Sequence, residues 1–178
     1  MVDILTYIKE IGEIVEELDN LGRQPILIGG IALAILGSQR ITKDFDFVVS
    51  TEAEQSDDNK KLLEIFYKRD FELVSKINSQ KQITATIDNK NIAAMRLKLD
   101  EPDSIYFYNK KIGLRIDLLF DFPFPAHELA ARAEVKKIKS YTFRIASKAD
   151  LLALKKIAYK NRKLSTDLQD LEFLKKLK

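Results

Sequence analysis

Residues 26–50 read ILIGGIALAILGSQRITKDFDFVVS and contain several elements in quick succession. The apolar run 26–28 predicts a short buried strand, which Gly29 and Gly30 then interrupt. Residues 31–36 regain helical propensity, and the aromatic and β-branched residues of 44–50 predict a second strand. This stretch therefore predicts a strand, a tight glycine turn, a helix and another strand.

Asp44 and Asp46 lie two residues apart on the second strand, so both carboxylates point to one face of the sheet. Phe45 and Phe47 then point to the other face, into the core. Two adjacent carboxylates repel unless a cation joins them, and Mg²⁺ prefers oxygen ligands of this kind. Taken alone, such a pair also fits a solvated sheet edge.

The glycine pair adds a phosphate-binding element to the carboxylates. Gly29 and Gly30 let the backbone approach a ligand closely, and the amides at the start of the following helix favour phosphate. A phosphate cradle beside two metal-binding carboxylates is what a nucleoside triphosphate (NTP) requires.

A third carboxylate, Asp117, lies in the otherwise apolar strand GLRIDLLF, residues 113–120. A carboxylate is costly to bury there unless it has a partner. Arg115 lies on the same face, so an Arg115–Asp117 stripe on the protein surface is the alternative interpretation.

The remaining pattern is mixed. Apolar residues recur at helical spacing from Ile4 to Leu21, and Gly22 ends that helix. Further helices are expected over 60–69, 126–134, 148–159 with Ser147 as N-cap, and 167–177 with Ser165 or Thr166 as cap. Short strands are expected over 71–77, 82–87, 92–99, 104–108, 113–120 and within 137–147, with a hairpin turn at DNKN, residues 88–91. The order predicts an α+β fold, a mixed β-sheet flanked by helices, with a main domain over 1–145 and a C-terminal helical part over 146–178.

Composition excludes several kinds of site. The 178 residues contain no cysteine, which excludes disulfides, thiolate metal sites and cysteine nucleophiles. The one histidine, His127, cannot build a catalytic triad or a zinc site, and we expect it at the surface. The longest apolar run, 26–37, is shorter than the roughly 20 residues that span a bilayer. Because the acidic, amphipathic N-terminus also lacks the pattern of a signal peptide, we expect a cytoplasmic protein with no membrane partner.

The run ILIGG, the spacer of thirteen residues, DFDF and the later acid in IDL together resemble the DNA polymerase β-type nucleotidyltransferase superfamily. The resemblance implies the nucleotidyltransferase fold. It also implies that Asp44, Asp46 and Asp117 bind two Mg²⁺ ions and carry catalysis, and that Gly29 and Gly30 line the triphosphate. It leaves the usual serine role open, because Ser38 is not adjacent to the glycines.

GSQRITKDFDF, residues 37–47, and ADLLALKKIAYKNRKLSTDLQDLEFL, residues 149–174, resemble the AbiEii-like toxin nucleotidyltransferases more closely. That resemblance implies that Lys155 contacts phosphate and that Asp167 belongs to a fourth motif, although Thr166 stands where the family usually has lysine. Arg40 and Lys43 are candidates for contacting phosphates of the nucleotide or of a nucleic acid. The alternative for these four residues is ordinary solvated surface.

The implied activity is metal-dependent transfer of a nucleoside monophosphate (NMP) from an NTP to an acceptor, with release of pyrophosphate. The acceptor of a toxin-like enzyme would be tRNA or another RNA, and a cognate antitoxin would be its partner. The alternatives are an antitoxin-type enzyme that adenylylates a partner toxin protein, a degenerate member that only binds nucleotide, and an unrelated α+β binding domain. The mild net charge of +3, concentrated in Lys148–Lys178, is compatible with a polyanionic partner and equally with a solvated helix surface.

Overall fold

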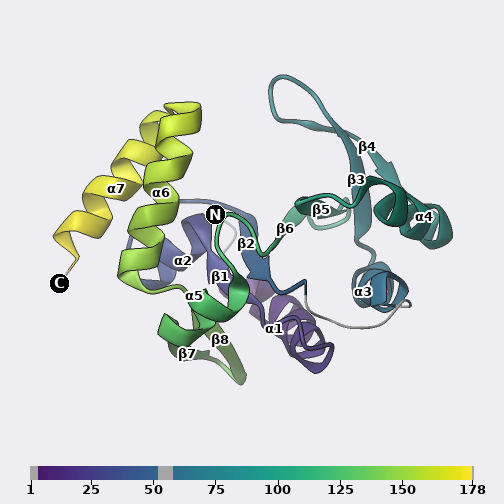
Figure 1. Ribbon diagram of the computed structural model, residues 1–178, viewed down its shortest axis with the longest axis horizontal. Helices are drawn as coiled ribbons and strands as arrows, with labels where there is room; N and C mark the ends of the chain where they lie inside the picture. The colour runs from purple at the N-terminus through teal and green to yellow at the C-terminus, as the bar shows by residue number, and fades with distance from the viewer. Residues whose placement is uncertain (1–3, 52–57, 178) are drawn as a thin grey trace.

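The computed structural model describes residues 4–51 and 58–177, which form a mixed sheet with helices around it (Figure 1). The strands are β1 (Ile26–Ile28), β2 (Asp44–Val49), β3 (Glu72–Ile77), β4 (Ile83–Ile87), β5 (Ser104–Asn109), β6 (Leu114–Phe120), β7 (Glu134–Ile138) and β8 (Tyr141–Ile145). The helices are α1 (Ile4–Asn20), α2 (Gly29–Ile35), α3 (Asp58–Tyr67), α4 (Lys90–Asp100), α5 (Ala126–Arg132), α6 (Lys148–Arg162) and α7 (Ser165–Lys176).

The strands form one sheet in the order β4-β3-β5-β6-β2-β1-β8-β7. The β2–β6 and β1–β8 pairs are parallel, whereas the other neighbours are antiparallel. The predicted α+β class with a mixed sheet is therefore confirmed. β2 lies in the middle of the sheet, between β1 and β6, so the strand with the paired aspartates is central and not an edge.

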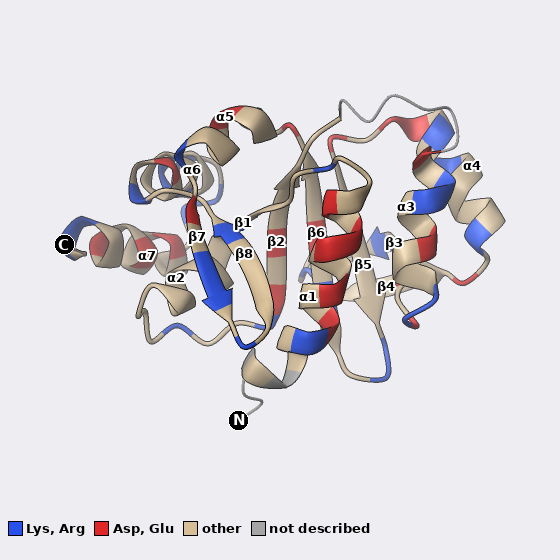
Figure 2. Cartoon of the chain, turned by 90° about the horizontal axis from the view of Figure 1, so that it is seen from below, with Lys and Arg blue, Asp and Glu red and all other residues tan. Residues whose placement is uncertain are grey.

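Alternating burial divides the sheet into two faces. Phe45 and Phe47 are each 1% exposed, and they lie in the core with the apolar side of α1. Figure 2 shows α1 and α3 lying across this face. Asp44 and Asp46 alternate with the two phenylalanines and therefore belong to the opposite face.

Helices also lie toward both sides of the sheet. Near β1, α6 packs against α7, which also contacts α2. Beyond the β3–β4 hairpin, α4 packs against α3, which in turn contacts α1. Figure 1 shows α6 and α4 at opposite ends, with β6 and β5 between them.

One predicted strand is wrong. Residues 92–99 belong to helix α4, and the predicted turn residue Asn89 is its N-cap, whose side chain accepts hydrogen bonds from the backbone amides of Asn91 and Ile92. The residues that follow are mostly strong helix formers, and Ala93 and Leu97, four residues apart, are buried. The helix propensity of these residues and the Asn89 cap therefore favour a helix over the predicted strand.

The two predicted caps at the C-terminal helices have different outcomes. Ser147 is confirmed as the N-cap of α6, since its side chain accepts from the amide of Asp150. The predicted cap of the last helix is wrong, because Leu164 occupies the N-cap of α7 and makes no side-chain cap bond.

No helix within residues 4–51 and 58–177 is both long enough and apolar enough to cross a membrane.

Candidate active site

Strand register brings two of the three predicted acids together. In the parallel β2–β6 pair, Asp46 lies directly opposite Asp117, and Asp44 lies opposite Arg115. Residues opposite each other in a strand pair share one face of the sheet. Asp46 and Asp117 are thus direct neighbours, and Asp44 and Arg115 lie beside them on the same face of the two strands.

Gly29 lies against the same carboxylates. β1 pairs with β2 so that Ile28 faces Asp46, and Gly29 is the next residue. Gly29 has φ +70°, and a Cβ there would lie 1.9 Å from Oδ2 of Asp46. Only glycine fits this position, because φ is positive and because a side chain would overlap the Asp46 carboxylate.

Gly30 makes a different close approach. A Cβ on Gly30 would lie 2.7 Å from Cγ2 of Thr42 and 3.3 Å from Cζ of Arg40. The second glycine therefore lets the segment before β2 pass close to α2.

Arg115 holds Asp117 with two hydrogen bonds. Its Nε donates to Oδ1 at 2.6 Å and its Nη2 donates to Oδ2 at 2.7 Å, and the guanidinium lies 4.4 Å from the ring centre of Tyr106. The pairing considered from the sequence is therefore present. It is not a surface stripe, however, because Asp117 is only 7% exposed.

The crowded carboxylates have altered acidities. Burial, reinforced by the charges of Asp117 and Asp44, raises the pKa of Asp46 to about 8. Burial also raises the pKa of Asp117 to about 6, although Arg115 and a hydrogen bond with Asp46 oppose the rise. The pair resists carrying two negative charges in the absence of a further cation.

A pocket of about 410 Å³ opens over these residues, between the sheet and α6. Of the residues predicted from the sequence, Gly29, Asp46, Asp117 and Lys155 line it. Arg115, Tyr106, Phe122, Ile157 and Arg162 also line it. The pocket thus places acids on the sheet opposite cations on α6.

Lys155 belongs to a charged cluster between α6 and α7. Its Nζ lies 2.6 Å from Asp170 and 3.6 Å from Asp167. Arg162 contacts Asp167 at 2.8 Å, and Arg40 pairs with Asp170. The two aspartates are buried, at 1% and 3% exposed, so they fix the two α6 cations at the pocket wall.

The remaining predicted residues lie outside the pocket lining. Asp44 and Lys43 are exposed, and Arg40 points to Asp170 as described above. The hydroxyl of Ser38 accepts from the amide of Arg40 at 3.3 Å. Asp167 supports the pocket wall from behind, and His127 is exposed on α5.

The donor set suits a hard divalent cation, although it is not fully assembled. Asp46 and Asp117 offer carboxylate oxygens, as Mg²⁺ prefers, and Gly29 leaves the space beside Asp46 free of a side chain. Among residues 4–51 and 58–177, no group of three or more acidic, histidine or cysteine side chains stands ready to hold a metal. Asp117 is not free to act as a ready metal ligand because Arg115 donates a hydrogen bond to each of its two carboxylate oxygens.

Sequence reasoning missed Arg162, Asp170, Tyr106 and Phe122. Helical spacing carries a signal for two of them, because Arg162 is seven residues after Lys155, and Asp170 three residues after Asp167, on one side of each helix. Tyr106 and Phe122 reach the pocket through strand register and a loop, and no local pattern in the sequence indicates either.

Comparisons with known proteins bear on the family and the fold of the chain. A family model described as "Nucleotidyl transferase AbiEii toxin, Type IV TA system" matches residues 15–178. No curated protein matches the chain by sequence.

Three solved structures share the fold. An antigenic nucleotidyltransferase-like protein from Paracoccidioides brasiliensis is 19% identical, with a TM-score of 0.53 over 96% of this chain and 74% of its own. The lincosamide antibiotic adenylyltransferase LnuA, with lincomycin bound, is 12% identical and has a TM-score of 0.56. The match covers 96% of this chain and 97% of LnuA. ANT(2")-Ia, in complex with adenylyl-2"-tobramycin, is 11% identical and has a TM-score of 0.56. The match covers 95% of this chain and 87% of ANT(2")-Ia. At these identities the likeness establishes the fold alone, and it confirms the predicted nucleotidyltransferase fold.

Proposed function

The chain belongs to the AbiEii nucleotidyltransferase toxin family, and from that premise we propose that it moves NMP from an NTP to an acceptor hydroxyl in a reaction that depends on divalent metal ions. The observation that carries the proposal is the pairing of Asp46 with Asp117 across β2 and β6. Lys155 and Arg162 face these acids from the other wall of the same pocket.

Asp46 and Asp117 would hold the metal ions, with Asp44 joining them from the same face of β2. When bound, Mg²⁺ supplies charge neutralisation for the triphosphate and for the leaving pyrophosphate. In this class of reaction the protein mainly positions groups and stabilises charge.

Lys155 and Arg162 are the residues we assign to the phosphates, with Gly29 lining the same pocket and Gly30 beside it. Asp170 and Asp167 hold the two cations in place through the contacts of 2.6 Å and 2.8 Å. Arg40 and Lys43 remain candidates for contacts with phosphates further from the reacting centre. Asp167, the predicted fourth-motif residue, would then act through Lys155 and Arg162.

An apolar part of the pocket suits the nucleobase. Phe122 is 49% exposed and Ile157 is 37% exposed, yet both line the pocket together with Leu154. Large apolar side chains left open to solvent inside a polar pocket are typical of ligand contacts. We assign the base to the space between the loop that carries Phe122 and helix α6.

Asp117 is the group we assign to the acceptor. With a pKa near 6 it is largely ionised at neutral pH, and a carboxylate oxygen of Asp117 would accept the proton of the acceptor hydroxyl. Arg115 keeps that carboxyl ionised and oriented through its two hydrogen bonds.

An RNA acceptor such as tRNA is the finer proposal for this toxin-like enzyme, together with a cognate antitoxin as partner and a cytoplasmic location. The direct test incubates the protein with each NTP labelled at the α-phosphate, Mg²⁺, total RNA and a cell protein extract. Label in RNA supports the proposal. Label in protein would indicate the adenylylating alternative, and label in neither fraction would indicate a degenerate member.

Variants make this test specific to the site. Asp46→Asn and Asp117→Asn should lower transfer by orders of magnitude, whereas Glu172→Gln, an exposed acid on α7, serves as the matched control. Transfer that continues unchanged in both aspartate variants would overturn the proposed site.

A further inference from the structure

The loop that follows β6, residues 121–125 and here called the Phe122 loop, contributes Phe122 and Pro123 to the pocket over the candidate metal site. Its first residue, Asp121, lies outside the pocket lining. We propose that Asp121 is a positioning residue for the nucleobase, because its carboxylate fixes both ends of the loop that carries Phe122. This inference rests on the proposed nucleotidyl transfer and on the assignment of the base to this loop.

The Asp121 carboxylate joins separate parts of the chain. Its Oδ2 accepts hydrogen bonds from the backbone amide of Thr51 at 2.7 Å and from the Thr51 hydroxyl at 2.5 Å. Its Oδ1 accepts from the amide of Ala126, the first residue of α5, at 2.7 Å. The backbone amide of Asp121 donates to the carbonyl of Val49, the last residue of β2. One residue thus ties the end of β2 and the start of α5 to the end of β6.

The backbone of Asp121 needs these bonds. Its φ is +48°, in the left-handed region, where the Cβ of an L-residue crowds the following carbonyl oxygen. Aspartate tolerates this conformation better than most residues, since its short side chain can form local hydrogen bonds. The bonds from Thr51 and Ala126 therefore stabilise a turn that the backbone alone disfavours.

The rest of the Phe122 loop transmits this anchoring to the pocket. Two prolines follow Phe122 in the loop, and each has a fixed φ of about −65°, so few backbone rotations remain between the anchored ends. Phe124 packs against the hydrophobic core, whereas Phe122 is exposed and lines the pocket. One aromatic ring thus holds the loop from inside while the other faces the space assigned to the base.

Strand β6 leads from the candidate metal site to this loop. Asp117 and Leu119 lie on the same face of the strand, about 7 Å apart along it, and both line the pocket. Asp121 then turns the chain, and Phe122 continues the lining. The apolar surface therefore begins next to the acids and extends away from them, as the base of a metal-bound nucleotide requires.

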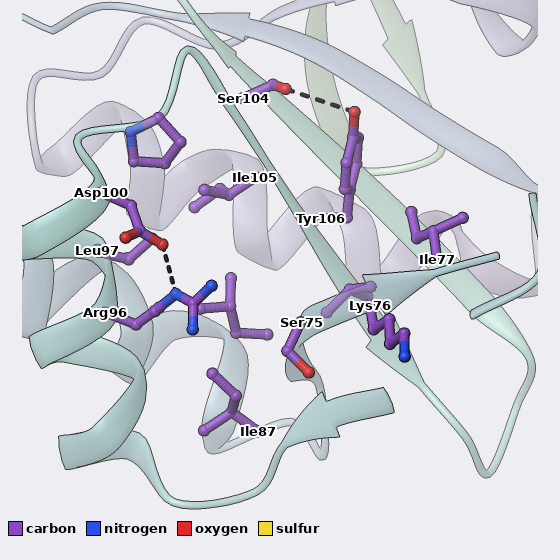
Figure 3. A pocket seen from close by; sticks show the side chains of 13 residues that line it. Ser75, Lys76, Ile77, Ile87, Arg96, Leu97, Asp100, Ser104, Ile105 and Tyr106 are labelled. Carbon is purple, nitrogen blue, oxygen red and sulfur yellow. Dashed lines mark hydrogen bonds and ion pairs between the residues drawn. The ribbon is translucent and has the colours of Figure 1, made fainter. Parts of the chain in front are cut away.

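Another pocket, of about 290 Å³, also has apolar walls, but these lie on the other face of the sheet. Residues of β3, α4 and β5 line it, Ile105 among them (Figure 3). In the β5–β6 pair Tyr106 lies opposite Asp117, whereas Ile105 lies opposite Leu118. Ile105 therefore belongs to the core face, away from the acids. Of these two pockets, the one beside the Phe122 loop is the one that joins apolar walls to the acids.

Calorimetry with two probes separates a role toward the base from a general loss of structure. The first probe is a non-hydrolysable analogue of whichever NTP the wild type binds most tightly. The second is tripolyphosphate, which has no base, and Mg²⁺ is present with both. The variants are Asp121→Asn, Thr51→Val, Phe122→Ala and the double variant Asp121→Asn/Phe122→Ala. Asp88→Asn, at an exposed position in the turn before α4, is the matched control.

We expect Phe122→Ala to weaken analogue binding by about tenfold or more, the loss that removal of one stacked base produces, and Asp121→Asn to weaken it by a similar factor. The double variant should bind the analogue no more weakly than Phe122→Ala, because residues that act through one loop are not additive. Tripolyphosphate affinity should stay at the wild-type value throughout, and Asp88→Asn should match the wild type with both probes.

Thr51→Val makes the test independent of whether Asp121→Asn folds. It removes one of the three hydrogen bonds to the carboxylate and should weaken analogue binding by a smaller factor, again without an effect on tripolyphosphate.

Wild-type analogue affinity in both Asp121→Asn and Thr51→Val would overturn the inference. Equal losses for the analogue and for tripolyphosphate would also overturn it, because they indicate a purely structural role. Additive losses in the double variant would do the same, since Asp121 would then act independently of Phe122. A wild type that shows no Mg²⁺-dependent analogue binding would instead contradict the proposed function itself, so the two failures are distinguishable.

Discussion

Asp46 and Asp117 are direct partners in a parallel strand pair, although 70 residues separate them in the chain. Their carboxyl groups are close enough for each to shift the acidity of the other. A fold that places two acids in this way carries an electrostatic cost that a bound cation removes.

That cost predicts how stability depends on pH. The folded-state pKa of Asp46, about 8, lies above the unfolded value of about 4. The unfavourable contribution is therefore absent below about pH 4 and grows until about pH 8, so stability falls as pH rises through this window. Asp46→Asn removes the charge and should raise the Tm of the metal-free protein by at least about 3 °C at pH 8.

The gain from Asp46→Asn should shrink at pH 5.5, since the native carboxyl is then mostly protonated. Differential scanning calorimetry in the presence of a chelator measures both values, with Asp88→Asn at an exposed position as the control. An equal gain at both pH values would contradict a raised pKa for Asp46.

Gly29→Ala should abolish transfer. The new Cβ would overlap the Asp46 carboxylate, 1.9 Å away, and the positive φ adds strain of about 1–2 kcal/mol. Gly22→Ala separates the two effects, since Gly22 has φ +75° and open space around it. Gly22→Ala should lose only the stability that the strain costs, about 1–2 kcal/mol, and keep its activity in the transfer assay. Equal activity in both variants would show that the close approach to Asp46 has no function.

Asp170→Asn should lower stability and phosphate affinity together. It removes the charge that pairs with Lys155 and Arg40, and breaking a buried ion pair costs about 3–5 kcal/mol. Urea unfolding measures the first effect and calorimetric binding of an ATP analogue measures the second. Glu172→Gln on the exposed side of α7 should change neither quantity, and Asp170→Asn binding the analogue as tightly as wild type would remove Lys155 from the phosphate site.

Arg115→Gln should lower transfer by about 10–100-fold, the effect of losing a group that orients a metal ligand. Loss of the guanidinium also raises the pKa of Asp117, because Arg115 is the strongest influence that lowers it. The acidic limb of the pH–rate profile should therefore move to higher pH. A lower rate with an unmoved acidic limb would indicate a structural role for Arg115 alone.

The sequence predicted the parts of the fold that depend on local pattern. The glycine turn after β1, the alternation of Asp44–Phe47 and the Ser147 cap all lie within short windows whose physics is local. The α4 helix was missed because its apolar residues also fit a strand, and the Asn89 cap was interpreted as a turn.

The partners of the site residues were beyond local reasoning. That Asp117 faces Asp46, and that Tyr106 faces Asp117, follows from strand order in the sheet, which no short window encodes. The cluster of Lys155, Arg162, Asp167 and Asp170 likewise forms only when α6 packs on α7. The order of charged residues in the sequence does not show which of them form buried ion pairs in the folded protein.

We propose that Asp46 and Asp117 together hold divalent metal with the nucleotide, and isothermal titration calorimetry tests this most directly. Mn²⁺ is titrated into the protein with and without a non-hydrolysable ATP analogue, for wild type, Asp46→Asn, Asp117→Asn and Glu172→Gln. We predict metal binding that the analogue strengthens in wild type and Glu172→Gln, and its loss in both aspartate variants. Metal and nucleotide affinities that stay the same in all four proteins would contradict the account.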